Sequence, residues 1–323
     1  MVLDAIKNFH KQLKYRPEIQ NDEAFQKRDK FIVAGMGGSN LASGLLKIWN
    51  PKLDIIIHRD YGLPDSEKEL DGRLVIASSY SGNTAETIDT FKTALDYKLP
   101  VIAISTGGKL LELAKELKAP YIQLPDLDTQ PRLALGVSLK AMAKAMGEVK
   151  ALSELEELAE SLDSGAFEPE GKELAEKLND KIPLIYSSVS NKPLAYIWKA
   201  MINEDAKIPA FCNVFPEANH NDMNGFDSAP AAEPLSAKFH FIFLKDGADD
   251  ERIQTRMNLA KKMYEDRGLG VEIIGMPDGS VWDKIFRIFF LAEWTAYYLA
   301  KNYKVDPEKT LLVEEFKKAM DGK

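Results

Sequence analysis

The chain has 323 residues, of which 45% are hydrophobic and 28% are charged, a composition that fits one large or two ordinary globular domains and excludes a disordered protein. The net charge of −8 and the absence of a basic stripe interleaved with aromatic residues argue against a nucleic-acid partner, so an anionic ligand would have to be held locally. A single cysteine, Cys212, excludes an intrachain disulfide, and the four histidines lack the spacing of a Cys/His metal cluster. We find no N-terminal secretion signal and no run of 18 apolar residues that could form a membrane segment. These observations predict a cytoplasmic protein.

Short apolar segments alternate with helical segments through the first 150 residues. The expected strands are 31–34, 53–58, 74–78, 100–105 and 121–124. The expected helices are 41–49, 85–97, 110–118 and 132–150. Alternation of this kind predicts a parallel sheet that helices cover on both faces.

A charged helical segment, 150–180, is expected to join two domains, residues 1–150 and 151–323. The alternation then resumes, with strands at 183–186, 239–244 and 271–274 and helices at 194–205, 249–267 and 280–301. We expect a last helix with Asp306 as N-cap and Pro307 at its first position. The fold class is therefore α/β, with two αβα sandwich domains.

The two halves resemble copies of one plan. Ser79–Asn83 and Ser187–Asn191 both follow an expected strand and precede an expected helix. The first of these segments is much richer in residues that could bind a ligand.

A glycine-rich loop, Gly35–Asn40, joins the first strand to its helix. Glycines let the backbone approach a ligand, and a helix N-terminus offers unpaired N–H groups. A dinucleotide fingerprint is one interpretation, because Gly35 and Gly37 fit it and Asp60 lies at about the expected distance. The third glycine is missing, since residue 40 is Asn, so NAD remains the weaker alternative.

A second loop, residues 78–84, opens the helix at 85–97. It carries hydroxyl groups at Ser79, Ser81 and Thr84 around one turn, which suits the three acceptor oxygens of a phosphate monoester. The alternative is plain helix capping, because Asn83 and Glu86 have the spacing of a capping box. One cap needs one such residue and not four, so phosphate binding is favoured.

A candidate acid–base residue ends the helix 194–205. The apolar residues of this helix form one stripe, made of Leu194, Ile197, Trp198 and Met201. Glu204 is expected to continue the stripe at the last turn, where a partly desolvated carboxylate suits a general base. The alternative is a solvated glutamate at the helix end.

His220 lies sixteen residues beyond Glu204, in a segment rich in Pro and Asn. A loop histidine can move a proton near neutral pH. The alternative is that His220 is a surface histidine without a role. The nearby Glu217 either orients the imidazole or is only adjacent to it.

Together these residues resemble the archaeal-type bifunctional phosphoglucose/phosphomannose isomerases, which consist of two sugar isomerase (SIS) domains. The resemblance covers nearly the whole chain. The matching segments follow the family order and are Gly35–Ser39, Ser79–Thr84, Pro131–Arg132, Asn203–Glu204, Pro216–Glu217, His220–Asn221 and Phe316–Lys317. Asn40, Met223–Gly225 and the long charged linker depart from the family pattern and bear on specificity more than on reaction type.

The resemblance implies an aldose–ketose isomerase that interconverts glucose 6-phosphate and mannose 6-phosphate with fructose 6-phosphate through a cis-enediol, without a metal or other cofactor. It also implies a cytoplasmic homodimer of glycolysis and gluconeogenesis. The implied substrate-binding residues are Gly37, Gly38 and Ser39 around the sugar, Ser79, Ser81 and Thr84 on the phosphate, and Thr310 near C1 and C2.

The implied catalytic residues are Glu204, His220, Lys317 and Arg132. Glu204 would carry the proton between C1 and C2, and Arg132 would stabilise the enediolate. His220, contributed by the partner subunit, and Lys317 would open the sugar ring. Thr310 and Lys317 are seven residues apart, which is two helical turns, so both could face one site.

Two alternatives remain from other classes. A non-catalytic SIS module that senses a sugar phosphate would keep the serine loop but need neither Glu204 nor His220, and would usually carry a DNA-binding appendage, which is not visible here. Another SIS enzyme that acts on amino-sugar phosphates would share the phosphate loop, but Thr310 and Lys317 argue against it.

Overall fold

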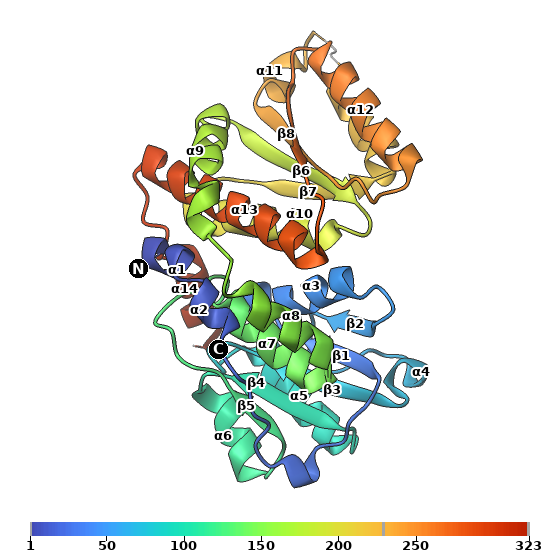
Figure 1. The fold of residues 1–323 in the computed structure, drawn as a ribbon, viewed down its shortest axis with the longest axis vertical. Helices are drawn as coiled ribbons and strands as arrows, with labels where there is room; N and C mark the ends of the chain where they lie inside the picture. The colour runs from blue at the N-terminus through green and yellow to red at the C-terminus, as the bar shows by residue number, and fades with distance from the viewer. Residues whose placement is uncertain (1, 228–229, 322–323) are drawn as a thin grey trace. The chain divides into compact units, whose positions relative to one another are not determined.

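The computed structural model describes residues 2–227 and 230–321 and divides into two compact units, each taken by itself below (Figure 1). One unit is Lys7–Ser164, and the other combines the described residues of 1–6 and 165–323. The domain boundary that we expected at residue 150 stays a prediction; in the structure the segment 149–158 is grouped with the strands that precede it. Within the described ranges, no helix has both the length and the apolar character needed to cross a bilayer.

The unit Lys7–Ser164 contains a five-stranded parallel sheet in the order β2-β1-β3-β4-β5. Its strands are β1 (Lys30–Ala34), β2 (Asp54–His58), β3 (Arg73–Ser78), β4 (Val101–Ser105) and β5 (Tyr121–Gln123). Its longer helices are α3 (Leu41–Trp49), α5 (Ala85–Asp96), α6 (Gly108–Glu116), α7 (Leu135–Met146) and α8 (Val149–Leu158). Its short helices are α2 (His10–Leu13), η1 (Asp22–Ala24), η2 (Gly37–Asn40) and α4 (Glu67–Leu70), and α1 (Val2–Lys7) precedes them.

Both faces of this sheet are covered, which explains the nearly continuous apolar runs of its central strands. β4 is buried along its whole length, and β3 is buried from Leu74 onward. One set of alternate strand residues, with Val75 and Ala103 among them, packs against Phe91 of α5 and Leu110 of α6. Because helices cover both faces of the sheet, the loops that follow the carboxyl ends of the strands are the places where functional residues can lie.

The second unit contains a four-stranded parallel sheet in the order β7-β6-β8-β9. Its strands are β6 (Ile182–Ser188), β7 (Phe211–Phe215), β8 (Phe239–Lys245) and β9 (Gly270–Gly275). Its longer helices are α9 (Glu168–Lys177), α10 (Lys192–Met201), α12 (Glu251–Glu265), α13 (Val281–Tyr303) and α14 (Leu311–Asp321). Its shorter turns are η3 (Ser164–Phe167), η4 (Ile202–Ala206), η5 (Glu217–Asn219), η6 (Asp222–Phe226) and α11 (Glu233–Ser236).

An aromatic layer fills one face of the second sheet. Tyr186, Phe241 and Phe243 project from β6 and β8, and Tyr264 of α12 stacks on Phe241 with ring centroids 4.2 Å apart. Helices α9, α10 and α13 pack together elsewhere in the unit. Burial on both faces of β8 again explains the apolar run 241–244 in this strand.

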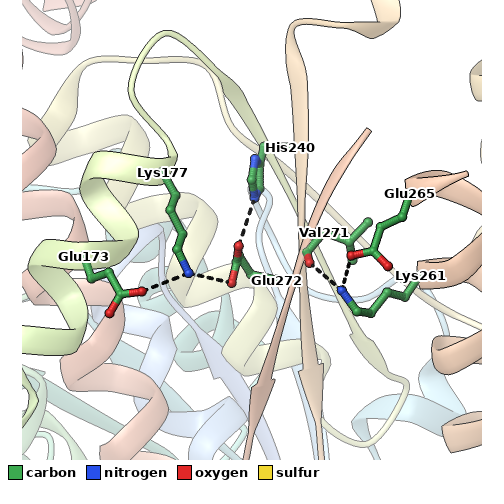
Figure 2. Close-up of polar contacts among 7 residues, drawn as sticks. All are labelled: Glu173, Lys177, His240, Lys261, Glu265, Val271 and Glu272. Carbon is green, nitrogen blue, oxygen red and sulfur yellow. Dashed lines mark hydrogen bonds and ion pairs between the residues drawn. The ribbon is translucent and has the colours of Figure 1, made fainter. Parts of the chain in front are cut away.

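A network of charged side chains ties the edge of this sheet to α9. Figure 2 shows Lys177 between Glu173 (3.0 Å) and Glu272 (3.1 Å), with His240 on the other side of Glu272 at 3.9 Å. His240 is only 7% exposed, so burial lowers its pKa, and Glu272 offsets part of this effect. On the other side of β9, Lys261 pairs with Glu265 and donates to a β9 carbonyl.

The predicted α/β fold class is confirmed, and so is the equivalence of the two loops, each of which follows a strand and precedes a helix. The expected helix 132–150 is wrong, because Gly147, at φ +76°, ends α7 and α8 starts anew at Val149. The tail helix does not begin at Asp306. The Asp306 carboxylate instead accepts a hydrogen bond from the Glu308 N–H (2.9 Å) in a local turn, and α14 starts at Leu311.

Candidate functional site

The glycine loop and the serine loop lie side by side because β1 and β3 are neighbours in the parallel sheet. The backbone N–H of Tyr80 donates to Ser39 Oγ (2.9 Å), and Ser78 Oγ donates to the Ser39 carbonyl (3.1 Å). A Cβ atom on Gly35 would lie 2.7 Å from the Ser78 carbonyl oxygen, so only glycine permits this approach. The sheet and these bonds thus bring two of the expected ligand-binding loops into direct contact.

The serine loop turns back on itself at Gly82. This residue has φ +72°, and a Cβ atom on it would lie 1.8 Å from the Gly107 carbonyl oxygen. The Gly82 N–H donates to Ser79 Oγ (3.1 Å), and Ser79 Oγ lies 2.9 Å from Thr84 Oγ1. Ser81 is exposed, and its Oγ accepts from the Asn83 N–H (3.3 Å). The three expected phosphate ligands therefore share one tight turn.

The first turn of α5 is not capped by a side chain. Its N-cap is Thr84, whose side chain makes no capping hydrogen bond. Asn83 Oδ1 accepts instead from the Lys109 N–H (3.1 Å), outside the helix. The capping box of Asn83 and Glu86 is therefore the wrong interpretation. Backbone N–H groups at such a helix end, beside three hydroxyl groups, form an arrangement that suits an anion.

Arg132 is held next to the glycine loop by close backbone packing. A Cβ atom on Gly38 would lie 2.6 Å from the Arg132 backbone nitrogen, so the loop and the segment before α7 touch at this point. Arg132 is 1% exposed. A buried guanidinium beside loops that suit an anion is the type of residue that stabilises negative charge in a reaction.

Glu204 lies on a single π-helical turn, η4, and not on a continuous α-helix as we expected. The apolar stripe of α10 is continued in this turn by Asp205, which is fully buried, and not by Glu204. Glu204 is half-buried. Single π-turns of this type occur frequently at functional sites, so this one singles out Glu204 as a candidate.

The C-terminal tail begins close to this turn. Lys207 ends η4 in the left-handed conformation and donates to the Glu204 carbonyl. The pKa of Asp306 is lowered by the hydrogen bond from the Glu308 N–H, and to a smaller degree by the charges of Lys309 and Lys207. Lys207 and Asp306 therefore lie near one another.

Thr310 and Lys317 belong to the same tail. Thr310 is half-buried just before α14, and its Oγ1 donates to Glu314 Oε1 (3.4 Å). Lys317 is exposed on α14, two turns further on. That these two side chains reach the substrate stays a prediction.

His220 is exposed and follows the 3-10 turn η5. Since α10 runs back along the sheet, η4 precedes β7 and η5 follows it, so Glu204 and His220 lie at opposite ends of that strand. At about 3.3 Å per residue, the five residues of β7 span roughly 15 Å. Glu217 Oε1 accepts from Asn221 Nδ2 (3.4 Å), which leaves Glu217 as a neighbour of the imidazole.

Sequence reasoning missed several residues that hold these loops. The Tyr80 hydroxyl accepts from the Leu127 N–H (3.0 Å), and Thr106 Oγ1 donates to the Tyr80 carbonyl (2.8 Å). Ser105 ends β4 and Thr106 follows it at the same sheet edge, and this position was the signal that could have identified them. Among residues 2–227 and 230–321, no group of three or more His, Cys, Asp or Glu side chains is arranged to hold a metal ion.

Comparison with known proteins identifies relatives over most of the chain. Residues 167–320 match the family model described as the bacterial phospho-glucose isomerase C-terminal SIS domain. A bifunctional phosphoglucose/phosphomannose isomerase of Caldicellulosiruptor bescii is 34% identical over 299 residues, which cover 86% of each chain. A D-glucosamine-6-phosphate 4-epimerase of Sulfolobus acidocaldarius is 25% identical over 90% of this chain and 88% of its own.

Solved structures share the fold. The C-terminal domain of glucosamine-fructose-6-phosphate aminotransferase from Francisella tularensis superposes with a TM-score of 0.66 over 95% of this chain and 96% of its own, at 15% identity. Identity at that level is informative about fold alone. It agrees with two parallel sheets covered by helices.

Proposed function

The chain belongs to the family of bifunctional phosphoglucose/phosphomannose isomerases, and we propose from this premise that it interconverts glucose 6-phosphate and mannose 6-phosphate with fructose 6-phosphate. Aldose–ketose isomerisation is the reaction of the family. The observation that carries the proposal for this chain is Glu204, a half-buried carboxylate on a π-turn, which a module that only binds sugar phosphates would not need.

The phosphate group is bound by Ser79, Ser81 and Thr84 together with the first N–H groups of α5. The support is that no side chain caps this helix and that the three hydroxyl groups share the turn in front of it. A phosphate accepts hydrogen bonds from hydroxyl and amide groups alike, so both kinds of donor contribute. Gly37, Gly38 and Ser39 line the sugar beside the phosphate.

The reaction proceeds through a cis-enediolate. Once the ring is open, Glu204 removes the proton from C2 of the aldose, and the electron pair moves into a C1–C2 double bond while negative charge develops on O1. Arg132 stabilises that charge. Glu204 then returns its proton to C1 as the O2 proton moves to O1, which yields the ketose. Because glucose and mannose differ at C2 alone, both give the same enediol if the site allows rotation about C2–C3, and one base then serves both.

Ring opening requires a proton shuttle, which we assign to His220 with help from Lys317, while Thr310 contacts the substrate near C1 and C2. Within one chain His220 and Glu204 lie at opposite ends of β7. That separation supports a homodimer in which the His220 of one subunit serves the Glu204 of the other. A cytoplasmic location remains part of the proposal, supported by the single cysteine.

The alternative substrate class is an amino-sugar phosphate. The Sulfolobus acidocaldarius epimerase is the observation that favours it, since that relative is named for D-glucosamine 6-phosphate. The same serine loop would bind the phosphate of either sugar. Glucosamine 6-phosphate therefore belongs in the test.

The test is a coupled assay of fructose 6-phosphate formation from glucose 6-phosphate and from mannose 6-phosphate, run with and without a chelator. We expect turnover of both aldoses, insensitivity to the chelator and loss of both activities in Glu204→Gln. Turnover of glucosamine 6-phosphate alone would replace the proposal with the amino-sugar alternative. Binding of all three sugars without turnover would replace it with a sensing module.

A further inference from the structure

The loop that carries His220, residues 216–227, is fastened to its sheet by a polar anchor that the reaction as described does not use. We propose that Tyr186 and Asn213 are positioning residues that hold this histidine loop through Asp222, so that His220 can open the sugar ring. This inference rests on the proposed function, because it concerns the ring-opening step of that reaction.

The polar anchor is the carboxylate of Asp222, two residues beyond His220. Its Oδ2 accepts one hydrogen bond from the Tyr186 hydroxyl of β6 (2.7 Å) and one from Asn213 Nδ2 of β7 (2.8 Å). Hydrogen bonds to a charged acceptor are roughly twice as strong as those between neutral groups. The loop is thus tied to two adjacent strands at one point.

The Tyr186 ring cannot move to follow a displaced loop. It is 2% exposed, stacks on Phe243 with centroids 5.9 Å apart, and meets the edges of Phe215 and Phe241 at 5.8 and 5.6 Å. Burial and the bond to Asp222 raise the pKa of Tyr186, so its hydroxyl keeps its proton throughout the neutral range. The hydroxyl is therefore a fixed donor.

Apolar contacts, internal bonds and two arginines hold the rest of the loop: Arg256 donates to Asn219 Oδ1 (3.3 Å), and Arg267 pairs with Asp227 (2.9 Å). Ala218 is 1% exposed, and the Phe226 ring packs on Phe241 at 4.9 Å. The backbone of His220 is bonded to the Glu217 carbonyl (2.9 Å) and to Asn224 Nδ2 (2.9 Å), which are both inside the loop. The internal bonds fix the shape of the turn, the two arginines join it to α12 and to the residues just after α12, and Asp222 joins it to strands β6 and β7.

The direction matters because a proton shuttle must come within hydrogen-bond distance of the sugar oxygens. A misplacement of about 1 Å can lower a rate by about a hundredfold. His220 is exposed, so the position of its imidazole depends on the backbone of the loop. An anchor two residues away therefore contributes to where the imidazole points.

The experiment measures ring opening separately from proton transfer. Ring opening interconverts the α and β anomers of glucose 6-phosphate, and exchange NMR measures this rate. The background is Glu204→Gln, in which isomerisation is blocked, and Tyr186→Phe is added to remove one hydroxyl while the ring stays. Tyr264→Phe is the matched control, because its ring belongs to the same aromatic layer and its hydroxyl makes no hydrogen bond within the described residues.

In the Glu204→Gln background, we expect Tyr186→Phe to slow enzyme-catalysed anomer exchange at least tenfold. In the otherwise unchanged chain, Tyr186→Phe should lower kcat for isomerisation and keep KM within about twofold. Tyr264→Phe should leave both rates unchanged. Asp222→Ala should slow exchange at least as much as Tyr186→Phe, and Asp222→Asn, which keeps an acceptor oxygen, should restore most of the rate.

Two results would overturn the positioning role while the isomerase assignment stands: normal anomer exchange in Tyr186→Phe, or equal losses in Tyr186→Phe and Tyr264→Phe. If the unsubstituted chain forms no fructose 6-phosphate, the proposed function fails, and the positioning role fails with it.

Discussion

Replacing Gly82 by alanine tests the geometry of the serine loop directly. The residue has φ +72°, a left-handed conformation that costs an alanine about 1–2 kcal/mol. Its new Cβ atom would also lie 1.8 Å from the Gly107 carbonyl oxygen, where real contacts begin at about 3.0 Å. The loop therefore has to open.

The cost can be compared with a matched glycine in the same unit. Gly72 has φ +67°, but a Cβ atom on it would meet nothing within 4 Å, so Gly72→Ala carries the backbone cost alone. In Gly82→Ala the retreat of Gly107 also breaks the hydrogen bonds from Ser105 Oγ to Gly107 (2.8 Å) and from the Leu110 N–H to Gly82 (2.9 Å), worth about 1 kcal/mol each. We expect losses in the free energy of unfolding of about 1 kcal/mol for Gly72→Ala and about 3 kcal/mol for Gly82→Ala.

The assay is urea unfolding of both variants followed by circular dichroism, with steady-state kinetics on glucose 6-phosphate. Gly82→Ala should also raise KM at least tenfold, because the hydroxyl groups of Ser79 and Thr84 lose their common turn. Gly72→Ala should leave KM unchanged. Equal stability losses, or an unchanged KM in Gly82→Ala, would refute the described packing of the loop.

Three further predictions concern other parts of the chain. The double substitution Ser81→Ala with Thr84→Ala should raise KM for phosphorylated sugars about tenfold in steady-state kinetics, and an unchanged KM would remove the phosphate assignment. Glu204→Gln should lower kcat by roughly 10²–10⁴-fold while calorimetry shows normal substrate binding, and near-normal turnover would refute the base assignment. Burial keeps the folded-state pKa of His240 below its unfolded value near 6.5, so below that pH the unfolded chain binds more protons and stability falls as pH decreases. In urea unfolding between pH 7.5 and 5, His240→Gln should show a weaker fall in stability than the parent chain, and identical pH dependence in both would contradict this.

Most of the fold could be predicted because each element is defined by its own residues. The alternation of apolar runs and helical segments predicted α3 at its observed bounds and placed most strands to within about two residues. β7 was missed because it is an edge strand of mixed burial, and its sequence, with Cys212 and Asn213 at its centre, has no unbroken apolar run. The break at Gly147 could have been predicted from the glycine, but the strong helical pattern on both sides of it hid the signal.

Part of the candidate site could likewise be predicted from the sequence, and part could not. The serine loop follows from seven consecutive residues, so its turn was visible in the sequence. The position of Glu204 was not, because its π-turn is packed against α13, about eighty residues further along the chain, and the helical period alone allows either Glu204 or Asp205 to continue the buried stripe. The bond between Tyr186 and Asp222 joins residues 36 positions apart through the order of the strands, and no local pattern contains that information.

The most direct test of the whole account follows the hydrogen on C2. Glucose 6-phosphate that carries deuterium at C2 is converted in ordinary water, and the fructose 6-phosphate is analysed by NMR for deuterium at C1. An enediol reaction with Glu204 as the base predicts that part of the deuterium is lost to water and the remainder lies at C1. Complete retention at C1, the result expected of a direct hydride transfer, would contradict the predicted exchange of the deuteron with water on Glu204.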